Sequence, residues 1–238
     1  MQKVEGVGNM SKEHDKQTLA QRNNLIRAAV MGANDGILSV SGIVIGVAGA
    51  TTNSFAIFIA GFAGALAGTV SMAMGEYTSV HSQNDAQVKA EKVQEAALKT
   101  QYDTEFEFVK NKYAAQGISD ELATQATKEM MANDALGTTV RERYGFSLHH
   151  EVSAIGAAMA SMIAFPLGSL LPILAITLFP VKERVIAKGI AVLIALAITG
   201  YSAAHLSGAN EKRATIRNIV AGIFTMVVTY YIGTLTGH

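Results

Sequence analysis

The sequence predicts an all-α polytopic membrane protein with five transmembrane helices and a helical cytoplasmic insert between spans 2 and 3. Half of the 238 residues are hydrophobic and only 16% are charged, whereas charged residues make up roughly a quarter of a soluble domain. Asp35 is the only charged residue between Arg27 and Glu76, and residues 152–181 contain none. Both runs exceed the roughly 20 apolar residues that cross a bilayer core, which excludes a water-soluble single domain.

The composition also excludes several functional classes. Nineteen basic and nineteen acidic residues give a net charge of zero, so no nucleic-acid partner is expected. The absence of cysteine rules out disulfides, thiolate metal sites and cysteine nucleophiles. No phosphate-binding loop, catalytic triad or dinucleotide motif occurs in a suitable context, so the chain is not expected to be an enzyme, and no catalytic or cofactor-binding residue is predicted.

Charged and uncharged stretches alternate along the sequence and divide it into segments. Four segments are predicted: a cytoplasmic N-terminal tail (1–24), a transmembrane hairpin (25–80), an acidic helical insert (81–149) and a second transmembrane region (150–238). The five spans are expected at residues 28–50, 55–77, 151–180, 185–206 and 216–235. The turn between the first two spans is short, which makes them antiparallel. The third span is longer than a bilayer core and contains Pro166 and Pro172, so one long span, kinked or broken at an end, is expected there rather than two crossings.

The insert differs from the spans in its pattern. Acidic and basic residues alternate, and apolar residues recur at helical spacing, which predicts about three amphipathic helices. Gly117 is expected to end one helix, and Ser119 is expected to cap the start of the next.

The distribution of lysine and arginine predicts the orientation. In a five-span arrangement the tail, the insert and the loop around Lys212 share one side of the membrane, and the positive-inside rule makes that side cytoplasmic. The C-terminus then lies on the opposite side. Lys182 and Arg184 also fall on that opposite side and count against the assignment, but they are outnumbered. With no targeting extension in the sequence, the plasma membrane is expected.

Asp35 is the most informative single residue, because it lies well inside the first span. An ionisable group within a membrane is costly unless it is paired, hydrated or bound to a cation, and such groups usually belong to an ion or proton pathway. We therefore expect Asp35 to belong to an ion or proton pathway. A structural aspartate, bonded to neighbouring backbone or wetted near an interface, remains the alternative.

The second span supplies companions for Asp35. Met72 and Glu76 are four residues apart and share one helix face. A thioether favours late first-row metal ions, and carboxylates suit Fe²⁺ and Mn²⁺, so the three side chains are candidates for a mixed sulfur and oxygen site. Simple packing of Met72 is the alternative.

The insert contains a second set of candidate metal ligands, also built from carboxylates and thioethers. They are Glu91, Glu95, Glu105, Glu129, Met130, Met131 and Asp134. Hard oxygen ligands with an occasional thioether again suit Fe²⁺ or Mn²⁺. A solvated helix surface, on which glutamate and lysine alternate, explains the same pattern.

Glycine pairs spaced by four residues mark the first two spans. They are Gly32 and Gly36, Gly42 and Gly46, and Gly64 and Gly68. Such pairs allow helix backbones to approach closely in lipid, so tight packing or dimerisation is expected.

The segment from Arg27 to Gly36, together with residues 68–77 (GTVSMAMGEY), resembles the vacuolar iron transporter family of iron and manganese transporters. The resemblance extends over the chain after about residue 22 and includes the five spans and the acidic insert. It implies a homodimer that exports Fe²⁺ or Mn²⁺ from the cytosol in exchange for protons. It also implies that Asp35 and Met72 line an ion path between the first two spans, and that the insert binds metal ions.

The resemblance is incomplete in the insert. Glu105, Met130, Met131 and Asp134 match ligand positions of the plant-type pattern, whereas Gln94, Ala97 and Phe108 stand where that pattern has glutamates. Two other functions remain open at this point. One is a membrane-anchored ferroxidase, although the insert lacks the Glu-x-x-His pairs typical of di-iron helical sites. The other is a metal sensor that transports nothing.

Overall fold

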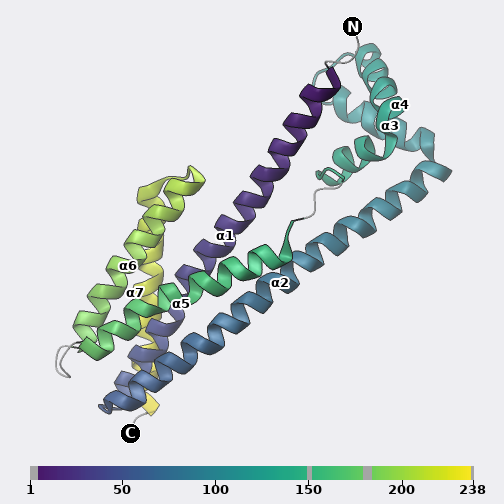
Figure 1. Ribbon diagram of the computed structural model, residues 1–238. Helices are drawn as coiled ribbons and strands as arrows, with labels where there is room; N and C mark the ends of the chain where they lie inside the picture. Colours follow the sequence, from purple (N-terminus) through teal and green to yellow (C-terminus); the bar gives the residue numbers. More distant parts are fainter. Residues whose placement is uncertain (1–4, 149–151, 179–183, 237–238) are drawn as a thin grey trace. The chain divides into compact units, whose positions relative to one another are not determined.

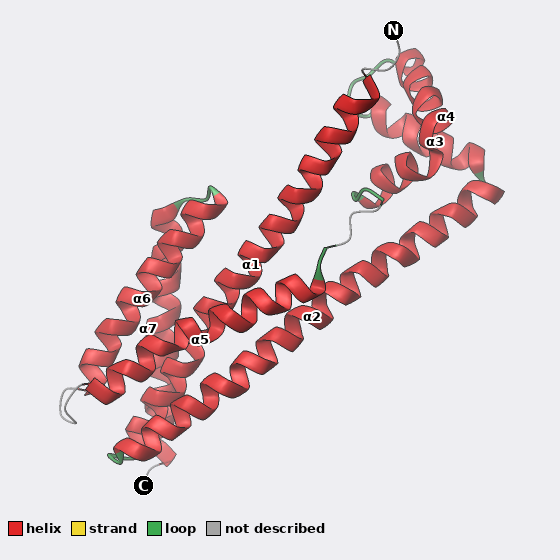
Figure 2. Ribbon diagram, in the orientation of Figure 1, coloured by secondary structure: helices red, strands yellow, loops and turns green. Residues whose placement is uncertain are grey.

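The computed structural model describes residues 5–148, 152–178 and 184–236, and these ranges are helical apart from short connections (Figures 1 and 2). Their helices are α1 (Glu5–Ala50), α2 (Ser54–Thr100), α3 (Tyr102–Ala114), α4 (Asp120–Tyr144), α5 (Ala154–Leu178), α6 (Arg184–Ser207) and α7 (Glu211–Thr236). Five of them, α1, α2, α5, α6 and α7, are long and apolar enough to cross a membrane. This confirms the predicted fold class.

The chain divides into two compact units, and α2 belongs partly to each. Residues 1–79 and 153–238 form the first, which we call the transmembrane unit, and residues 80–152 form the second, which we call the insert unit. The predicted domain boundary at residues 149–150 and the charged loop at 182–183 lie outside the described residues.

Helix α2 is much longer than the predicted second span. Its 47 residues correspond to about 70 Å at 1.5 Å per residue, more than twice the thickness of a bilayer core, which is roughly 30 Å. Residues 77–100 contain neither glycine nor proline, so nothing in the sequence stops the helix where the apolar run ends. The first of the three amphipathic helices predicted for the insert is therefore a continuation of span 2. Helix α1 is extended in the same way, because it begins at Glu5, inside the predicted tail.

Helix α5 is one continuous helix, as expected for the third span. It contains both Pro166 and Pro172. The hydroxyl of Ser169 donates a hydrogen bond to the carbonyl oxygen of Pro166 at 2.9 Å, three residues back along the helix.

Helix α1 is the central element of the transmembrane unit and packs against α5, α6 and α7. Small residues allow these contacts. A β-carbon at Gly36 would lie 2.2 Å from the carbonyl oxygen of Phe165, and one at Gly233 would lie 1.9 Å from that of Gly46. The backbones therefore meet at van der Waals distance, as the glycine pairs of span 1 predict.

In the insert unit, the turn between α3 and α4 is formed by the capping residues that the sequence predicts. Gly117 has a φ of +93° in the turn after α3. Ser119 caps α4 by accepting a hydrogen bond from the backbone N–H of Leu122 at 3.4 Å. Both predictions for this turn are confirmed. Val109 of α3 and Val140 of α4 are fully buried and belong to the apolar interior between the two helices.

Candidate functional site

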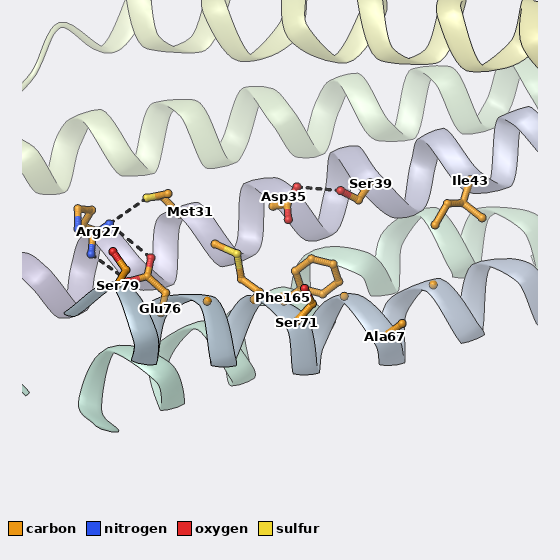
Figure 3. Close-up of a pocket in the computed structure, with 14 residues that line it drawn as sticks. Arg27, Met31, Asp35, Ser39, Ile43, Ala67, Ser71, Glu76, Ser79 and Phe165 are labelled. Carbon is orange, nitrogen blue, oxygen red and sulfur yellow. Dashed lines mark hydrogen bonds and ion pairs between the residues drawn. The ribbon is translucent and has the colours of Figure 1, made fainter. Parts of the chain in front are cut away.

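A pocket of about 600 Å³ lies between α1 and α2 in the transmembrane unit (Figure 3). On α1 it is lined by every fourth residue from Arg27 to Ile43, because residues four apart lie on one helix face. The facing wall comes from α2, between Gly64 and Ser79, and α5 contributes Phe165. The pocket therefore runs along the two antiparallel helices.

Asp35 lies near the middle of this stripe and is partly buried. Its Oδ1 accepts a hydrogen bond of 2.8 Å from the hydroxyl of Ser39, one turn further along α1 (Figure 3). A hydroxyl can donate to an ionised carboxylate and can also accept from a protonated one. The pair can thus remain bonded whichever charge Asp35 carries.

Met72 and Glu76 both line the same pocket. Glu76 has only 5% of its surface exposed, and its carboxylate forms an ion pair with Arg27, with 2.9 Å between Nη2 and Oε2. The structure therefore brings the three predicted transmembrane ligands to one pocket. It also pairs one of them with a cation of the protein itself.

Phe165 is the aromatic wall of the pocket and is 1% exposed. A β-carbon at Gly68 would lie 2.2 Å from its ring, so only glycine leaves space for this ring beside α2. Gly64 faces the side chain of Ile43 in a similar way. Two of the glycines predicted for backbone contact thus make room for side chains at the pocket.

Sequence reasoning missed three of the residues that shape this site: Arg27, Ser39 and Phe165. Spacing could have identified Ser39, which follows Asp35 by one helical turn. Arg27 and Glu76 could have been identified as opposite charges at the two ends of a stretch in which Asp35 is the only other charged residue. Nothing local indicates Phe165, because its role depends on how α5 packs.

Glu105 of the insert is buried and held by other groups of the protein. Arg143 donates to it from Nε and Nη2, with the shortest separation at 2.9 Å, and Gln94 donates from Nε2 at 2.7 Å. The guanidinium of Arg143 also lies 3.9 Å from the centre of the Phe108 ring. Gln94 and Phe108 are two of the positions at which the plant-type pattern has glutamates. In this chain the positive charge beside Glu105 is the guanidinium of Arg143.

The thioethers and the aspartate of the predicted insert site have structural contacts. The sulfur of Met130 lies 3.8 Å from the Tyr113 hydroxyl oxygen and 3.8 Å from Nη2 of Arg141, and Met131 is 3% exposed in the interior. Asp134 has non-helical backbone angles within α4, and its Oδ1 accepts from the N–H of Gly137 at 2.8 Å. Asp134 thus caps a helix segment that restarts after a break.

The remaining candidates of the insert lie closer to solvent. Glu95 pairs with Lys99 at 2.6 Å, and Glu129 accepts from Gln125 at 3.1 Å, while Glu91 is half-buried on α2. In the described ranges no three His, Cys, Asp or Glu side chains gather closely enough to hold a metal ion together. Metal binding by the insert stays a prediction.

Glu142 is the centre of a second charge cluster in the insert and is partly buried. It accepts from the Tyr113 hydroxyl at 2.7 Å and from Arg141 Nε at 3.0 Å, and it pairs with Lys112 at 3.2 Å. Burial acts to raise the pKa of Glu142, but the hydrogen bonds from Tyr113, Arg141 and Lys112 outweigh it and lower the pKa below its usual value. Burial, followed by the bond to Glu142, raises the pKa of Tyr113.

Comparison with known proteins gives a consistent result. The model of the VIT family matches residues 26–234. A vacuolar iron transporter of Acanthamoeba castellanii is 32% identical over 94% of this chain and 83% of its own length. Vacuolar iron transporter homolog 2 of Oryza sativa is 31% identical over 88% and 89%, and homolog 2 of Arabidopsis thaliana is 30% identical over 96% and 94%.

These names correct one prediction. The sequence led us to expect the plasma membrane, because it shows no targeting extension. The relatives are named vacuolar transporters, which points to an intracellular vacuolar membrane instead, and the expectation is therefore wrong. The inference failed because the absence of a recognisable extension carries little information about the destination of a multispan protein.

Proposed function

Because this chain belongs to the VIT family, we propose that it transports iron across a vacuolar membrane, carrying Fe²⁺ or Mn²⁺ out of the cytosol in exchange for protons. One observation carries the proposal. Asp35, Met72 and Glu76, from two different helices, line a single pocket that runs along the spans.

The chemistry of the pocket suits a divalent metal ion. Two carboxylates provide the hard oxygen donors and negative charge that Fe²⁺ and Mn²⁺ prefer, and Met72 adds a softer thioether. The remaining lining includes hydroxyls of Ser39 and Ser71 and small residues such as Gly68. Such a surface offers few strong ligands, which allows an ion to leave as well as to enter.

Asp35 is the proposed site of exchange between proton and metal. In a low-dielectric surrounding a carboxylate is stable when a proton or a metal ion neutralises it, so the two compete for the same group. The hydroxyl of Ser39 can serve both states by reversing its hydrogen bond. Movement of metal in one direction then returns protons in the other.

A homodimer is the proposed assembly, as the resemblance implies. The exposed surface of α2 is compatible with it, because Leu66, Val70 and Met74 have more than half of their surface exposed. In the membrane these side chains meet either lipid or a second copy. The insert is proposed to collect metal ions at the cytosolic side, through carboxylates that remain accessible, such as Glu91.

Flux through sealed proteoliposomes tests the proposal. The purified chain is reconstituted and offered Fe²⁺, Mn²⁺, Co²⁺ and Zn²⁺, with and without a proton gradient, while internal metal and pH are recorded. Asp35→Asn is expected to abolish metal uptake and the coupled pH change, because the amide cannot exchange a proton. Asp103→Asn makes the same chemical change at an exposed insert residue and serves as the matched control.

Normal flux in Asp35→Asn would refute the role of this carboxylate. Metal binding without any flux in the wild type would instead support the sensor. Oxygen consumption on addition of Fe²⁺ would support the ferroxidase.

A further inference from the structure

The ion pair between Arg27 and Glu76 occupies one end of the pocket between α1 and α2. Both residues line it, and Figure 3 shows the guanidinium directed at the carboxylate, beside Ser79. The guanidinium contacts both oxygens of Glu76, at 2.9 Å and 3.4 Å. A positive charge therefore already sits on one of the two carboxylates proposed to receive the metal.

The other contacts of Arg27 are also made with groups that can bind metal. Nη1 lies 3.3 Å from the sulfur of Met31, and Nη2 lies 3.0 Å from the Oδ1 of Asn24. Carboxylate, thioether and amide oxygen thus surround one guanidinium. These are the donor types of a mixed oxygen and sulfur site for a first-row metal ion, here engaged by a side chain.

The two partners differ strongly in exposure. Glu76 is 5% exposed, whereas the side chain of Arg27 is 46% exposed. A buried carboxylate without a counter-charge is strongly unfavourable, so Glu76, when ionised, needs a cation beside it. Almost half of the Arg27 side chain is exposed, and Arg27 stands just before the predicted span 28–50, so its long flexible stem can carry the guanidinium away from Glu76 toward the membrane interface.

We propose that Arg27 is an exchangeable counter-cation for Glu76, which an entering divalent metal ion must displace and which returns once the ion has moved on. The inference rests on the proposed transport function and adds a step of ion selection to it. A doubly charged ion interacts with Glu76 more strongly than the guanidinium does, whereas a hydrated monovalent ion offers no more charge than Arg27 and lacks its paired hydrogen bonds. The exchange therefore favours divalent ions.

The geometry also gives the exchange an order. Arg27 and Asp35 are eight residues apart on α1, or about 12 Å along the helix axis. An ion that enters beside Arg27 reaches Glu76 first and Asp35 afterwards. When the ion lies at Asp35, Glu76 is again without a partner, and the returning guanidinium neutralises it.

The reactivity of Arg27 toward phenylglyoxal tests the displacement directly. The full-length protein in detergent is modified with and without Mn²⁺, and the modification of each arginine is measured by mass spectrometry. Mn²⁺ is expected to accelerate modification of Arg27 on the order of tenfold, within the usual range of coupling between competing ligands. Arg22, an exposed arginine outside the pocket, is the internal control and is expected to react at the same rate throughout.

Two variants and one salt control complete the experiment. Glu76→Gln is expected to make Arg27 react fast even without Mn²⁺, because its charged partner is gone. Arg27→Gln is expected to bind Mn²⁺ more tightly than wild type and than Arg22→Gln, as followed by the loss of the free Mn²⁺ signal in electron paramagnetic resonance. Na⁺ at equal ionic strength is expected to leave Arg27 protected.

Three results would overturn the inference. The first is Mn²⁺ binding with unchanged reactivity of Arg27, which would leave the transport proposal intact. The second is an Arg27→Gln protein that binds Mn²⁺ no better than wild type. The third is release of Arg27 by Na⁺ to the same extent. Absence of any metal binding or flux in the wild type would reject the proposed function as well, and the flux assay identifies that case.

Discussion

Replacing Arg143 by methionine is expected to loosen the insert unit. Methionine keeps the apolar stem but removes the guanidinium that donates to Glu105 and that contacts Phe108. Glu105, which is 5% exposed, would then be left with Gln94. Breaking a buried ion pair in this way costs about 3–5 kcal/mol. Because one third of the Arg143 side chain is exposed, solvent screens part of the effect, and we expect the lower end, about 3 kcal/mol.

Hydrogen exchange measured by mass spectrometry on the full-length protein is the suitable assay, since it resolves the opening of each helix. A loss of about 3 kcal/mol corresponds to exchange about 150-fold faster, expected in peptides of α3 and α4 and not in those of α5. Lys128→Met removes an exposed charge from α4 and is the control. The double variant Arg143→Met with Glu105→Met is expected to recover most of the protection, because no buried charge remains unpaired.

Exchange in Arg143→Met that differs less than fivefold from wild type would refute this reasoning. The refutation would mean that Glu105 does not depend on Arg143 for its counter-charge. A double variant as labile as the single one would also contradict the argument, because packing would then be responsible rather than charge.

Three further outcomes are expected. Gly36→Ala should lower the thermal unfolding midpoint, because the added methyl group overpacks against the Phe165 backbone at a cost of about 1–3 kcal/mol. Gly189→Ala is the control and should not lower it, because a β-carbon there meets no neighbour within 4 Å. Equal midpoints for the two variants would contradict the close contact at Gly36. The pKa of Glu142 is lowered by folding, so the stabilisation that Glu142 gives the insert is complete above the usual pKa of 4.5 and is lost as pH falls through the lower pKa of the folded state. The urea concentration at the unfolding midpoint should therefore fall with decreasing pH more in the wild type than in Glu142→Gln. An equal fall in both proteins would refute this. If the insert binds metal, Mn²⁺ should slow exchange in α4 of the wild type, and unchanged exchange would speak against it.

The transmembrane architecture could be predicted because hydrophobicity is a local property. A bilayer demands uninterrupted apolar segments with satisfied backbone groups, so spans such as residues 28–50 and 216–235 can be identified from their own residues alone. The exception is the end of span 2. Apolar character ends near Tyr77, but a helix ends only where the backbone is broken or capped, so α2 continues to Thr100.

The candidate site was predictable in part for the same reason. Asp35 is conspicuous because its charge is isolated in an apolar run, and the spacing of Met72 and Glu76 places both on one face of α2. The partners of these groups were not predictable, because no local pattern joins residues 49 positions apart, such as Arg27 and Glu76. In the insert, carboxylates and thioethers suggest metal ligands by type, but type does not reveal that Arg143 already holds Glu105.

The amino-acid sequence by itself determined that five segments are apolar enough to cross a membrane and that one carboxylate, that of Asp35, lies alone within such a segment. These properties follow from the cost of burying polar groups in lipid, which each segment carries on its own. Only the tertiary structure decided which charges neutralise one another, which glycine leaves space for the Phe165 ring at the pocket, and which predicted ligands form bonds with other groups of the protein. Such pairings depend on distances between side chains of different helices, and those distances exist only after the helices have packed.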